Sequence, residues 1–210
     1  MQNQNKGLFI TFEGIDGCGK TTQMELVDKY LKSKNLKTLV TLEPGGCEIG
    51  KNLRQILLFH KGFVSDTAEM LLYLADRAQH IEEVVMKNVN KGINVLCDRC
   101  IDSTVAYQGY GRNGDIERIN FLNKIAMQGI EPDLTLVFDV DIETAQKRVG
   151  KDKDRLEKES LEFHKRVKNG YLELAQKFPN RIKVINSNQT IDEVFEDVKK
   201  IIDRILWKKI

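Results

Sequence analysis

A glycine-rich stretch near the start of the chain has the residue types and spacing that bind nucleotide phosphates. Residues 14–21, Gly-Ile-Asp-Gly-Cys-Gly-Lys-Thr, match G-x-x-x-x-G-K-[ST] in full, between an apolar run and a helical pattern. Glycines let backbone N–H groups turn toward the phosphates, and a helix N-terminus favours an anion. We therefore expect an ATP-binding site made of Gly14, Ile15, Asp16, Gly17, Cys18, Gly19, Lys20, Thr21 and Thr22.

The end of this stretch predicts phosphoryl transfer with a metal ion. We expect Lys20 to reach the transferred phosphate and the hydroxyl of Thr21 to hold Mg²⁺. A second carboxylate is expected at the end of another strand, and both Asp98 and Asp139 follow apolar runs. Asp98 is favoured because Arg99 follows it, and an adjacent carboxylate and guanidinium suit a site that holds both metal and phosphate.

The elements that must position these residues alternate between short apolar runs and helical patterns. This alternation predicts an α/β fold of the P-loop NTPase type, with three layers: a five-stranded parallel sheet and helices on both faces. Such a sheet binds ligands beyond the carboxyl ends of its strands, where Gly14 and Asp98 lie. The expected strands are Gly7–Glu13, Leu36–Leu42, Ile93–Asp98, Leu134–Asp139 and Ile182–Ile185, and the expected helices are Lys20–Ser33, Ile49–Leu58, Asp66–Val89, Arg155–Phe178 and Ile191–Trp207.

Length and composition limit the number of domains, the classes of partner and the cellular compartment. No repeat, linker or boundary divides it, so residues 1–210 are expected to form a single domain. A formal net charge of +2 argues against nucleic acid as a partner, and no apolar run approaches the roughly 20 residues that span a bilayer. No signal peptide is evident and the four cysteines suit free thiols, so we expect a cytoplasmic protein. Cys97 and Cys100 form a C-x-x-C, but further zinc ligands at suitable spacing are not evident.

Phosphate loops serve GTPases, ATPases and several kinds of kinase, and the loop alone does not choose among them. Beyond the loop, however, the chain resembles the thymidylate kinases in their bacterial form, a family of P-loop nucleoside monophosphate kinases. The resemblance is carried mainly by Phe12–Gln23 (FEGIDGCGKTTQ), Glu43–Gly46 (EPGG) and Asp98–Gly111 (DRCIDSTVAYQGYG). Weaker support comes from Leu72–His80 and Asp154–Tyr171.

This resemblance implies a reaction and a set of residue roles. It implies transfer of the γ-phosphate of ATP to dTMP with Mg²⁺, giving dTDP and ADP for dTTP synthesis, by a homodimer packed through the helix around Met70–Leu74. Lys20 and Arg99 are the implied catalytic residues of the core, and Thr21, Asp98 and Glu43 the metal-binding ones. The residues implied to bind dTMP are Asp16, Glu43, Arg54, Tyr73, Arg77, Arg99, Thr104, Tyr107 and Gln108.

A basic segment, Lys147–Arg155, is interpreted as part of a mobile lid over ATP that spans about residues 142–156. Gly17 and Cys18 carry no charge, whereas another branch of the family places a basic residue in the loop. An arginine from the lid, Arg148 or Arg155, would supply the missing cation. The alternative is a solvated helix end.

Two other functions use the same loop. A deoxynucleoside kinase would need a general base, for which Glu43 is available, but would have less use for the arginines. A regulatory ATP-binding module would be expected to lack catalytic groups. The chain departs from the family at Leu42, Cys47 and Cys100, which affects the shape of the acceptor pocket. We also expect Cys18 to be a reactive thiolate, because it lies at a helix N-terminus.

Overall fold

The structure, a computed structural model, describes residues 6–150 and 154–207 of the chain. Its centre is a five-stranded sheet in the order β2-β3-β1-β4-β5, and every pair of neighbours is parallel. The strands are β1 (Phe9–Glu13), β2 (Thr38–Leu42), β3 (Asn94–Asp98), β4 (Leu134–Asp139) and β5 (Ile182–Asn186). The predicted five-stranded parallel sheet is therefore confirmed, and each of the five predicted runs contains one of its strands.

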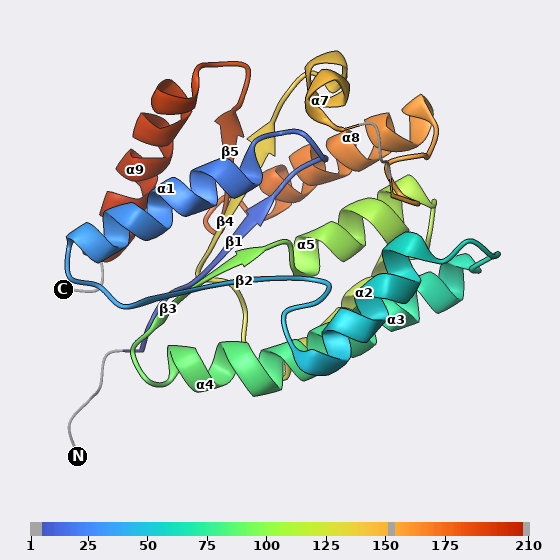
Figure 1. Cartoon of the computed structure of the whole chain (residues 1–210), viewed down its shortest axis with the longest axis horizontal. Coiled ribbons are helices and arrows are strands. Elements are labelled where there is room, and N and C mark those ends of the chain that lie inside the picture. The colour runs from blue at the N-terminus through green and yellow to red at the C-terminus, as the bar shows by residue number, and fades with distance from the viewer. Residues whose placement is uncertain (1–5, 151–153, 208–210) are drawn as a thin grey trace.

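Helices cover both faces of this sheet, which gives the predicted three layers (Figure 1). Helices α1 (Lys20–Ser33) and α9 (Ile191–Trp207) pack together over one face. The other face is covered by α4 (Met86–Val89), α5 (Ile101–Thr104) and α8 (Leu161–Lys177). In the described part of the chain, no helix combines the length and the apolar character needed to cross a membrane.

The remaining α-helices of the described residues precede or follow these elements in the chain. They are α2 (Glu48–Phe59), α3 (Asp66–His80), α6 (Ile116–Met127) and α7 (Ile142–Arg148). Two π-helical segments, η1 (Ile81–Val85) and η2 (Val105–Gly111), continue α3 into α4 and extend α5. The predicted helix Asp66–Val89 is thus one continuous helical segment with a widened turn.

The predicted start of the long helix at Arg155 is wrong. Residues 154–159 form turns, in which the Asp154 carboxylate accepts hydrogen bonds from the backbone N–H groups of Leu156 and Glu157 at 2.8 Å. Helix α8 begins after Ser160, whose hydroxyl accepts from the N–H of Phe163. The side chains of Asp154 and Ser160 thus accept backbone hydrogen bonds that carbonyl groups would accept in a longer helix. These two local contacts separate Arg155 from the start of α8.

The sheet register places the functional strand ends side by side. Asp98 of β3 pairs with Phe12 of β1 and with Leu42 of β2. The residues that follow these strands, Gly14, Glu43 and Arg99, therefore leave the sheet at one edge. Because that edge is where doubly wound sheets bind ligands, it is the place to examine for a site.

Candidate functional site

The phosphate loop between β1 and α1 adopts a backbone that only glycine tolerates well. Gly14, Gly17 and Gly19 have φ values of 136°, 79° and 95°. A Cβ atom at Gly17 would lie 2.3 Å from the carbonyl oxygen of Ala145 in α7. The loop and the first part of the predicted lid are therefore in close contact, and residue 17 must lack a side chain in this arrangement.

Lys20 opens α1 and turns its amine back toward the loop. Its Nζ lies 3.3 Å from the carbonyl oxygens of Gly14 and Ile15 and 3.9 Å from Oδ1 of Asp16. These carbonyl contacts are long for charge-assisted hydrogen bonds. A phosphate beside the loop would offer the amine a stronger partner.

Thr21 and Asp98 form the pair of oxygen ligands that the sequence predicts for a metal. The Thr21 hydroxyl donates to Oδ2 of Asp98 at 3.3 Å, while Oδ1 of Asp98 is buried without a hydrogen-bond partner in the described residues. The competing carboxylate, Asp139, is instead paired with Lys168 at 2.8 Å. An unpartnered buried carboxylate oxygen next to a hydroxyl fits Mg²⁺ or one of its waters, so the residues present suit this ion.

Arg99 lies at the centre of the site in a left-handed conformation, with φ at 68°. Its guanidinium donates to the Gly14 carbonyl at 3.0 Å and to the Tyr107 hydroxyl at 3.0 Å, and it pairs with Asp16. Burial alone would raise the pKa of Asp16, but Arg99 and Lys20 lower it to about 2. The Asp16 carboxylate is therefore ionised at neutral pH and holds Arg99 against the phosphate loop.

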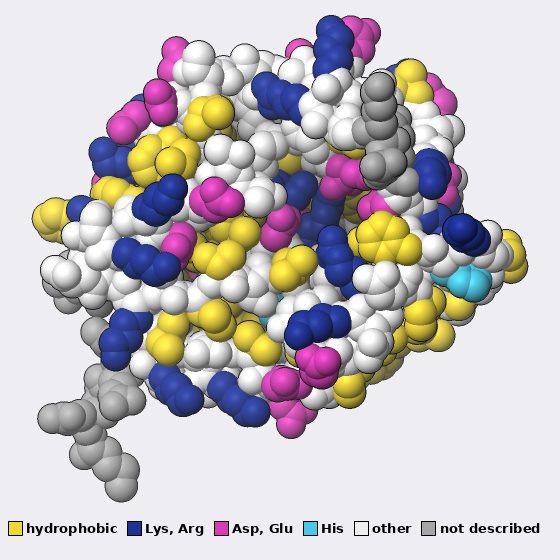
Figure 2. Space-filling view, viewed as in Figure 1, with side chains coloured by type: hydrophobic (Ala, Val, Ile, Leu, Met, Phe, Trp, Pro, Cys, Tyr) yellow, Lys and Arg dark blue, Asp and Glu magenta, His cyan; other side chains and the backbone are white. Residues whose placement is uncertain are grey.

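A pocket opens beside the loop, and every residue implied to bind dTMP lines it. Figure 2 shows this face of the molecule hollowed, with basic side chains inside the hollow and acidic ones around it. Leu58 and Leu156 add apolar walls that the sequence did not predict. The implied residues are Asp16, Glu43, Arg54, Tyr73, Arg77, Arg99, Thr104, Tyr107 and Gln108.

Arg77 of α3 is fully buried, and its contacts fix the guanidinium plane. Nε donates to Glu43 at 2.8 Å, and Nη1 donates to Thr104 at 2.8 Å and to Asn123 at 2.7 Å. Nη2 has no hydrogen-bond partner among the described residues, and Arg77 lines the pocket. The pocket is therefore supplied with an oriented donor group, the two N–H bonds of Nη2.

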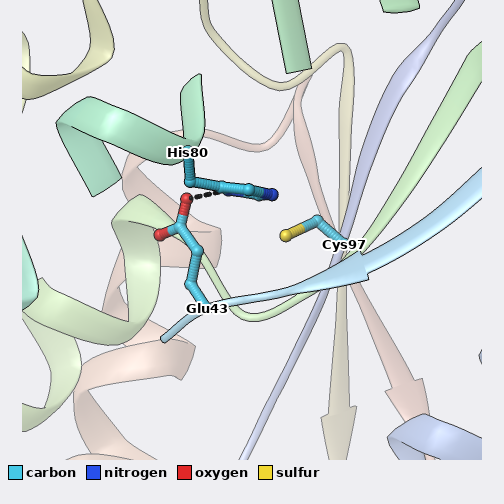
Figure 3. Close-up of side chains that lie close together, drawn as sticks. All are labelled: Glu43, His80 and Cys97. Carbon is cyan, nitrogen blue, oxygen red and sulfur yellow. Dashed lines mark hydrogen bonds and ion pairs between the residues drawn. The ribbon is translucent and has the colours of Figure 1, made fainter. Parts of the chain in front are cut away.

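Glu43 lies close to His80 and Cys97 in a buried cluster, in which His80 contacts the carboxylate (Figure 3). Nδ1 of His80 lies 2.9 Å from Glu43 Oε1, and Nε2 of the same ring lies 2.7 Å from the Thr41 hydroxyl. Burial raises the pKa of the Cys97 thiol well above its usual value. The histidine nitrogens both have partners and the thiol is protonated, so the cluster orients the Glu43 carboxylate rather than offering ligands to a metal.

On the opposite wall of the pocket, Gln108 contacts the buried carboxylate of Glu69. Nε2 of Gln108 donates to Oε1 of Glu69 at 2.7 Å. Tyr73 stands one helical turn after Glu69 on α3 and presents its ring to the same pocket. The wall thus combines a flat apolar surface with an amide, as a nucleobase site requires.

The two lid arginines occupy different places. Arg148, at the end of α7, lines a cleft above the phosphate loop together with Gly17, Lys20 and Thr21. Arg155 instead pairs with Glu69, and its Nε donates to the Leu57 carbonyl at 2.9 Å. Residues 151–153 of the predicted lid lie outside the described residues.

The three departures from the family sequence have identifiable positions. Cys47 caps α2, where its Sγ accepts from the N–H of Gly50 at 3.4 Å. Cys100 is fully buried and contacts Met127, and Leu42 lines the phosphate cleft. Neither cysteine is among the residues that line the acceptor pocket. Cys47 acts through capping, whereas Cys100 acts through packing and through its thiol, which donates to Oε1 of Glu43 at 3.7 Å.

The expectation of a reactive Cys18 is wrong. Cys18 is only 1% exposed and packs in the hydrophobic core. Burial raises the pKa of its thiol, and the nearby charges of Lys20 and Arg99 do not reverse this shift. Burial in the core therefore keeps this thiol protonated at neutral pH.

Several polar residues of the site were not predicted from the sequence. Glu13 accepts hydrogen bonds from the backbone N–H of Cys100 and the hydroxyls of Ser103 and Tyr171, at 2.7, 2.5 and 3.0 Å. Burial, with Asp102 nearby, raises the pKa of Glu13 to about 7. The only hint of this role in the sequence is the position of Glu13 directly before Gly14, the first residue of the phosphate loop. Asn123 belongs to α6, a helix the sequence reading missed.

The acceptor pocket and the phosphate cleft meet at a shared boundary. Asp16, Glu43, Arg54 and Arg99 line both of them. Nη1 of Arg54 donates to the Pro44 carbonyl at 2.8 Å, which holds this arginine across the EPGG turn. The boundary therefore carries two fixed guanidinium groups between a phosphate loop and a pocket suited to a base. This is the arrangement needed to bring two polyanions together.

Comparisons with known proteins agree with this geometry. The family model described as thymidylate kinase matches residues 12–198. The chain is 46% identical over 200 residues to the thymidylate kinase of Clostridium novyi (strain NT), covering 93% of this chain and 98% of that protein. It is 45% identical over 202 residues to that of Thermoanaerobacter sp. (strain X514), covering 96% and 100%. The crystal structure of thymidylate kinase from Ehrlichia chaffeensis matches with a TM-score of 0.79 and 35% identity, covering 94% of this chain and 99% of that one.

Proposed function

Because the chain belongs to the thymidylate kinase family, which phosphorylates dTMP to dTDP using ATP, we propose that its phosphate cleft binds ATP and its acceptor pocket binds dTMP. The observation that carries this assignment is the shared boundary of the two cavities. An acceptor phosphate beside Arg54 and Arg99 would lie next to the end of an ATP molecule held by the loop. In-line transfer needs the two reacting groups in this relation.

The chemistry assigned to the site is positioning and charge stabilisation. The phosphate of dTMP is already an anionic nucleophile, so the enzyme needs no strong general base. Arg54 and Arg99 would hold that phosphate, and Lys20 would contact the phosphoryl group in transfer. Asp16, ionised and paired with Arg99, fixes the arginine that both substrates share.

Thr21 and Asp98 are the residues that would hold Mg²⁺, with the unpartnered Oδ1 of Asp98 as the supporting observation. Glu43 is less suited to bind the ion, because both oxygens of its carboxylate already have partners, Arg77 and His80. The ion would neutralise charge on the β- and γ-phosphates of ATP.

Recognition of the base is assigned to the opposite end of the acceptor pocket. The ring of Tyr73 would stack on thymine. Among the described residues, Nη2 of Arg77 is a donor without a hydrogen-bond partner, and the carbonyl oxygen of Gln108 is an acceptor without one. Thymine offers the complementary pair, an acceptor at O4 and a donor at N3. Thr104, bonded to Arg77, completes this wall.

A panel of acceptors with ATP and Mg²⁺ tests this function. We expect kcat/KM for dTMP to exceed that for 5-methyl-dCMP by roughly 10-fold to 100-fold, because the cytosine edge leaves buried polar groups unpaired. The two acceptors differ only at N3 and position 4 of the base. Thymidine should be a far poorer acceptor, since it lacks the phosphate that Arg54 and Arg99 would bind. Equal efficiency with both methylated pyrimidines would reject the base assignment, and a preference for thymidine would favour a deoxynucleoside kinase.

We propose further that the enzyme is a cytoplasmic homodimer. Supporting observations are the free cysteines and an apolar surface on the packed helices α3 and α6. Leu71, Phe121 and Ile125 are 49%, 65% and 59% exposed in the single chain. Large apolar side chains gathered on one surface are typical of an interface.

The dimer predicts that one charged substitution separates the subunits. Phe121→Glu should convert a particle of twice the 24.1 kDa chain mass into a monomer in sedimentation equilibrium, because an unpaired charge would be buried in the interface. Phe178→Glu is the matched control, since Phe178 is 48% exposed but lies after α8. A wild-type protein that sediments as a monomer would contradict the proposal.

A further inference from the structure

Glu69 is a buried charge to which the proposed phosphoryl transfer assigns no role. It is 0% exposed, although carboxylates are rarely buried unless they are paired. Glu69, Tyr73 and Arg77 are spaced four residues apart on α3, so they share one face of the helix. Tyr73 and Arg77 line the acceptor pocket. The carboxylate therefore lies directly behind the wall assigned to base recognition.

The contacts of Glu69 determine which way the Gln108 amide points. An ionised carboxylate only accepts hydrogen bonds, so the amide must present its NH₂ group to Glu69, as it does at 2.7 Å. Arg112 and Arg155 also pair with Glu69. Burial would raise the pKa of Glu69, but the hydrogen bonds from Arg112 and Gln108 lower it, so the carboxylate stays ionised at neutral pH. The carbonyl oxygen of Gln108 is left without a partner in the described residues.

This orientation matters because a free glutamine amide is ambiguous. By rotating through half a turn it presents either a donor or an acceptor to a ligand. Thymine has a donor at N3 beside an acceptor at O4, whereas cytosine has an acceptor at N3 beside an amino donor. Because Glu69 engages the amide nitrogen of Gln108, the carbonyl oxygen is left for a ligand in the pocket that Arg77 also lines. An acceptor from Gln108 and a donor from Arg77 are complementary to thymine and not to cytosine.

We propose that Glu69 is a positioning residue that sets the base specificity of the enzyme by fixing the amide of Gln108. Glu69 does not touch the substrate. It acts through Gln108, and the inference rests on the proposed reading of the base by that residue. A second contact supports the assignment: Arg112, which pairs with Glu69 at 3.1 Å, is itself held by Glu159 at 2.6 Å, so the carboxylate has a fixed position.

The test compares dTMP with 5-methyl-dCMP in the full-length enzyme. Glu69→Gln supplies a side chain that can donate as well as accept, so Gln108 is free to turn. The ratio of kcat/KM for dTMP over 5-methyl-dCMP should fall by roughly tenfold or more. Arg112→Met is the matched control: it breaks the same ionic cluster but leaves Glu69 beside Gln108, so the ratio should stay within about twofold while Tm falls. Tm is measured for every variant.

A double-variant cycle separates positioning from general structural support. In a Gln108→Leu background the ratio should already be low, and adding Glu69→Gln should change it little. The positioning role of Glu69 would be overturned by an unchanged ratio in folded Glu69→Gln, or by an equal loss of the ratio in Arg112→Met. Either result would leave the proposed base reading by Gln108 in place. Should Glu69→Gln fail to fold, the double variant Glu69→Gln with Arg112→Met removes the carboxylate together with one of its two arginine partners, and it is judged by the same ratio. A wild-type ratio in Gln108→Leu would overturn the proposed base reading itself, and this inference with it.

Discussion

Lys20→Ala is expected to lower kcat by on the order of 10²-fold or more while the protein remains folded. The amine of Lys20 now lies 3.3 Å from two loop carbonyls, and no stronger acceptor than Asp16, at 3.9 Å, is near it in the described residues. When ATP fills the loop, its phosphates become the better partner. Charge then develops on the transferred group, and loss of the ammonium raises the barrier more than it weakens binding.

The measurement is ADP release at saturating dTMP and ATP, with Tm recorded for each protein. Lys29→Ala is the matched control, because Lys29 lies on the same helix, is exposed and faces away from the cleft residues. It should retain wild-type kcat. A folded Lys20→Ala protein with near-normal turnover would remove the phosphate loop from the mechanism.

The elements that the sequence predicted well are those with a single, strong pattern. Helix α1 and strand β4 match their predicted bounds, because one has a clear apolar face and the other is a mainly apolar run that ends at Asp139. Helix α6 was missed because its apolar residues point both ways. Ile119 and Met127 face the core, whereas Phe121 and Ile125 are exposed in the single chain. A helix with apolar residues on two sides has no simple amphipathic period.

The segment Ile101–Gly111 was missed for a different reason. Its glycines, Gly109 and Gly111, lower helix propensity, yet close packing requires at least one of them. A Cβ atom at Gly111 would lie 2.7 Å from the ring of Phe163 in α8. Only the tertiary fold reveals that contact.

The acceptor pocket was predicted through resemblance, whereas the network that orients it was not. The spacing of Tyr73 and Arg77 alone equally suits core packing. Glu69 stands in the same helical stripe, and nothing in the sequence separates a buried carboxylate from a solvated one. Its role depends on Gln108, Arg112 and Arg155, which are distant in sequence. The reverse error occurred at Cys18, where the local motif suggested reactivity but burial prevents it.

Removing the lid arginines one at a time is expected to produce the second large effect. At least one of Arg148→Ala and Arg155→Ala should lower kcat by roughly 10²-fold or more, while KM for dTMP stays within a few-fold. The physical reason is the phosphate loop. Gly17 lies against Ala145 and has no room for a side chain, so the loop cannot supply its own extra cation at this position. A guanidinium from the segment 142–156 would replace it.

The structure gives the two arginines different routes to the transferred phosphate. Arg148 is exposed and already lines the phosphate cleft. Arg155 must first leave Glu69 and the Leu57 carbonyl. Its Nη2 is buried without a partner in the described residues, which costs about 1–3 kcal/mol in the present arrangement. Movement toward the phosphate would relieve this cost and so offset part of the loss of the Glu69 and Leu57 contacts.

Two further measurements identify which arginine acts. Lys147→Ala is the control for general loss of positive charge, since Lys147 is exposed beside Arg148 and should leave kcat unchanged. Arg155→Lys keeps the charge but loses the planar fork, so it should fail to restore kcat if Arg155 contacts the phosphoryl group. Arg155→Ala should also lower Tm, because Glu69 loses one of its partners, whereas Arg148→Ala should not. Wild-type kcat in both alanine variants would return residues 147–155 to a solvated segment without a catalytic role.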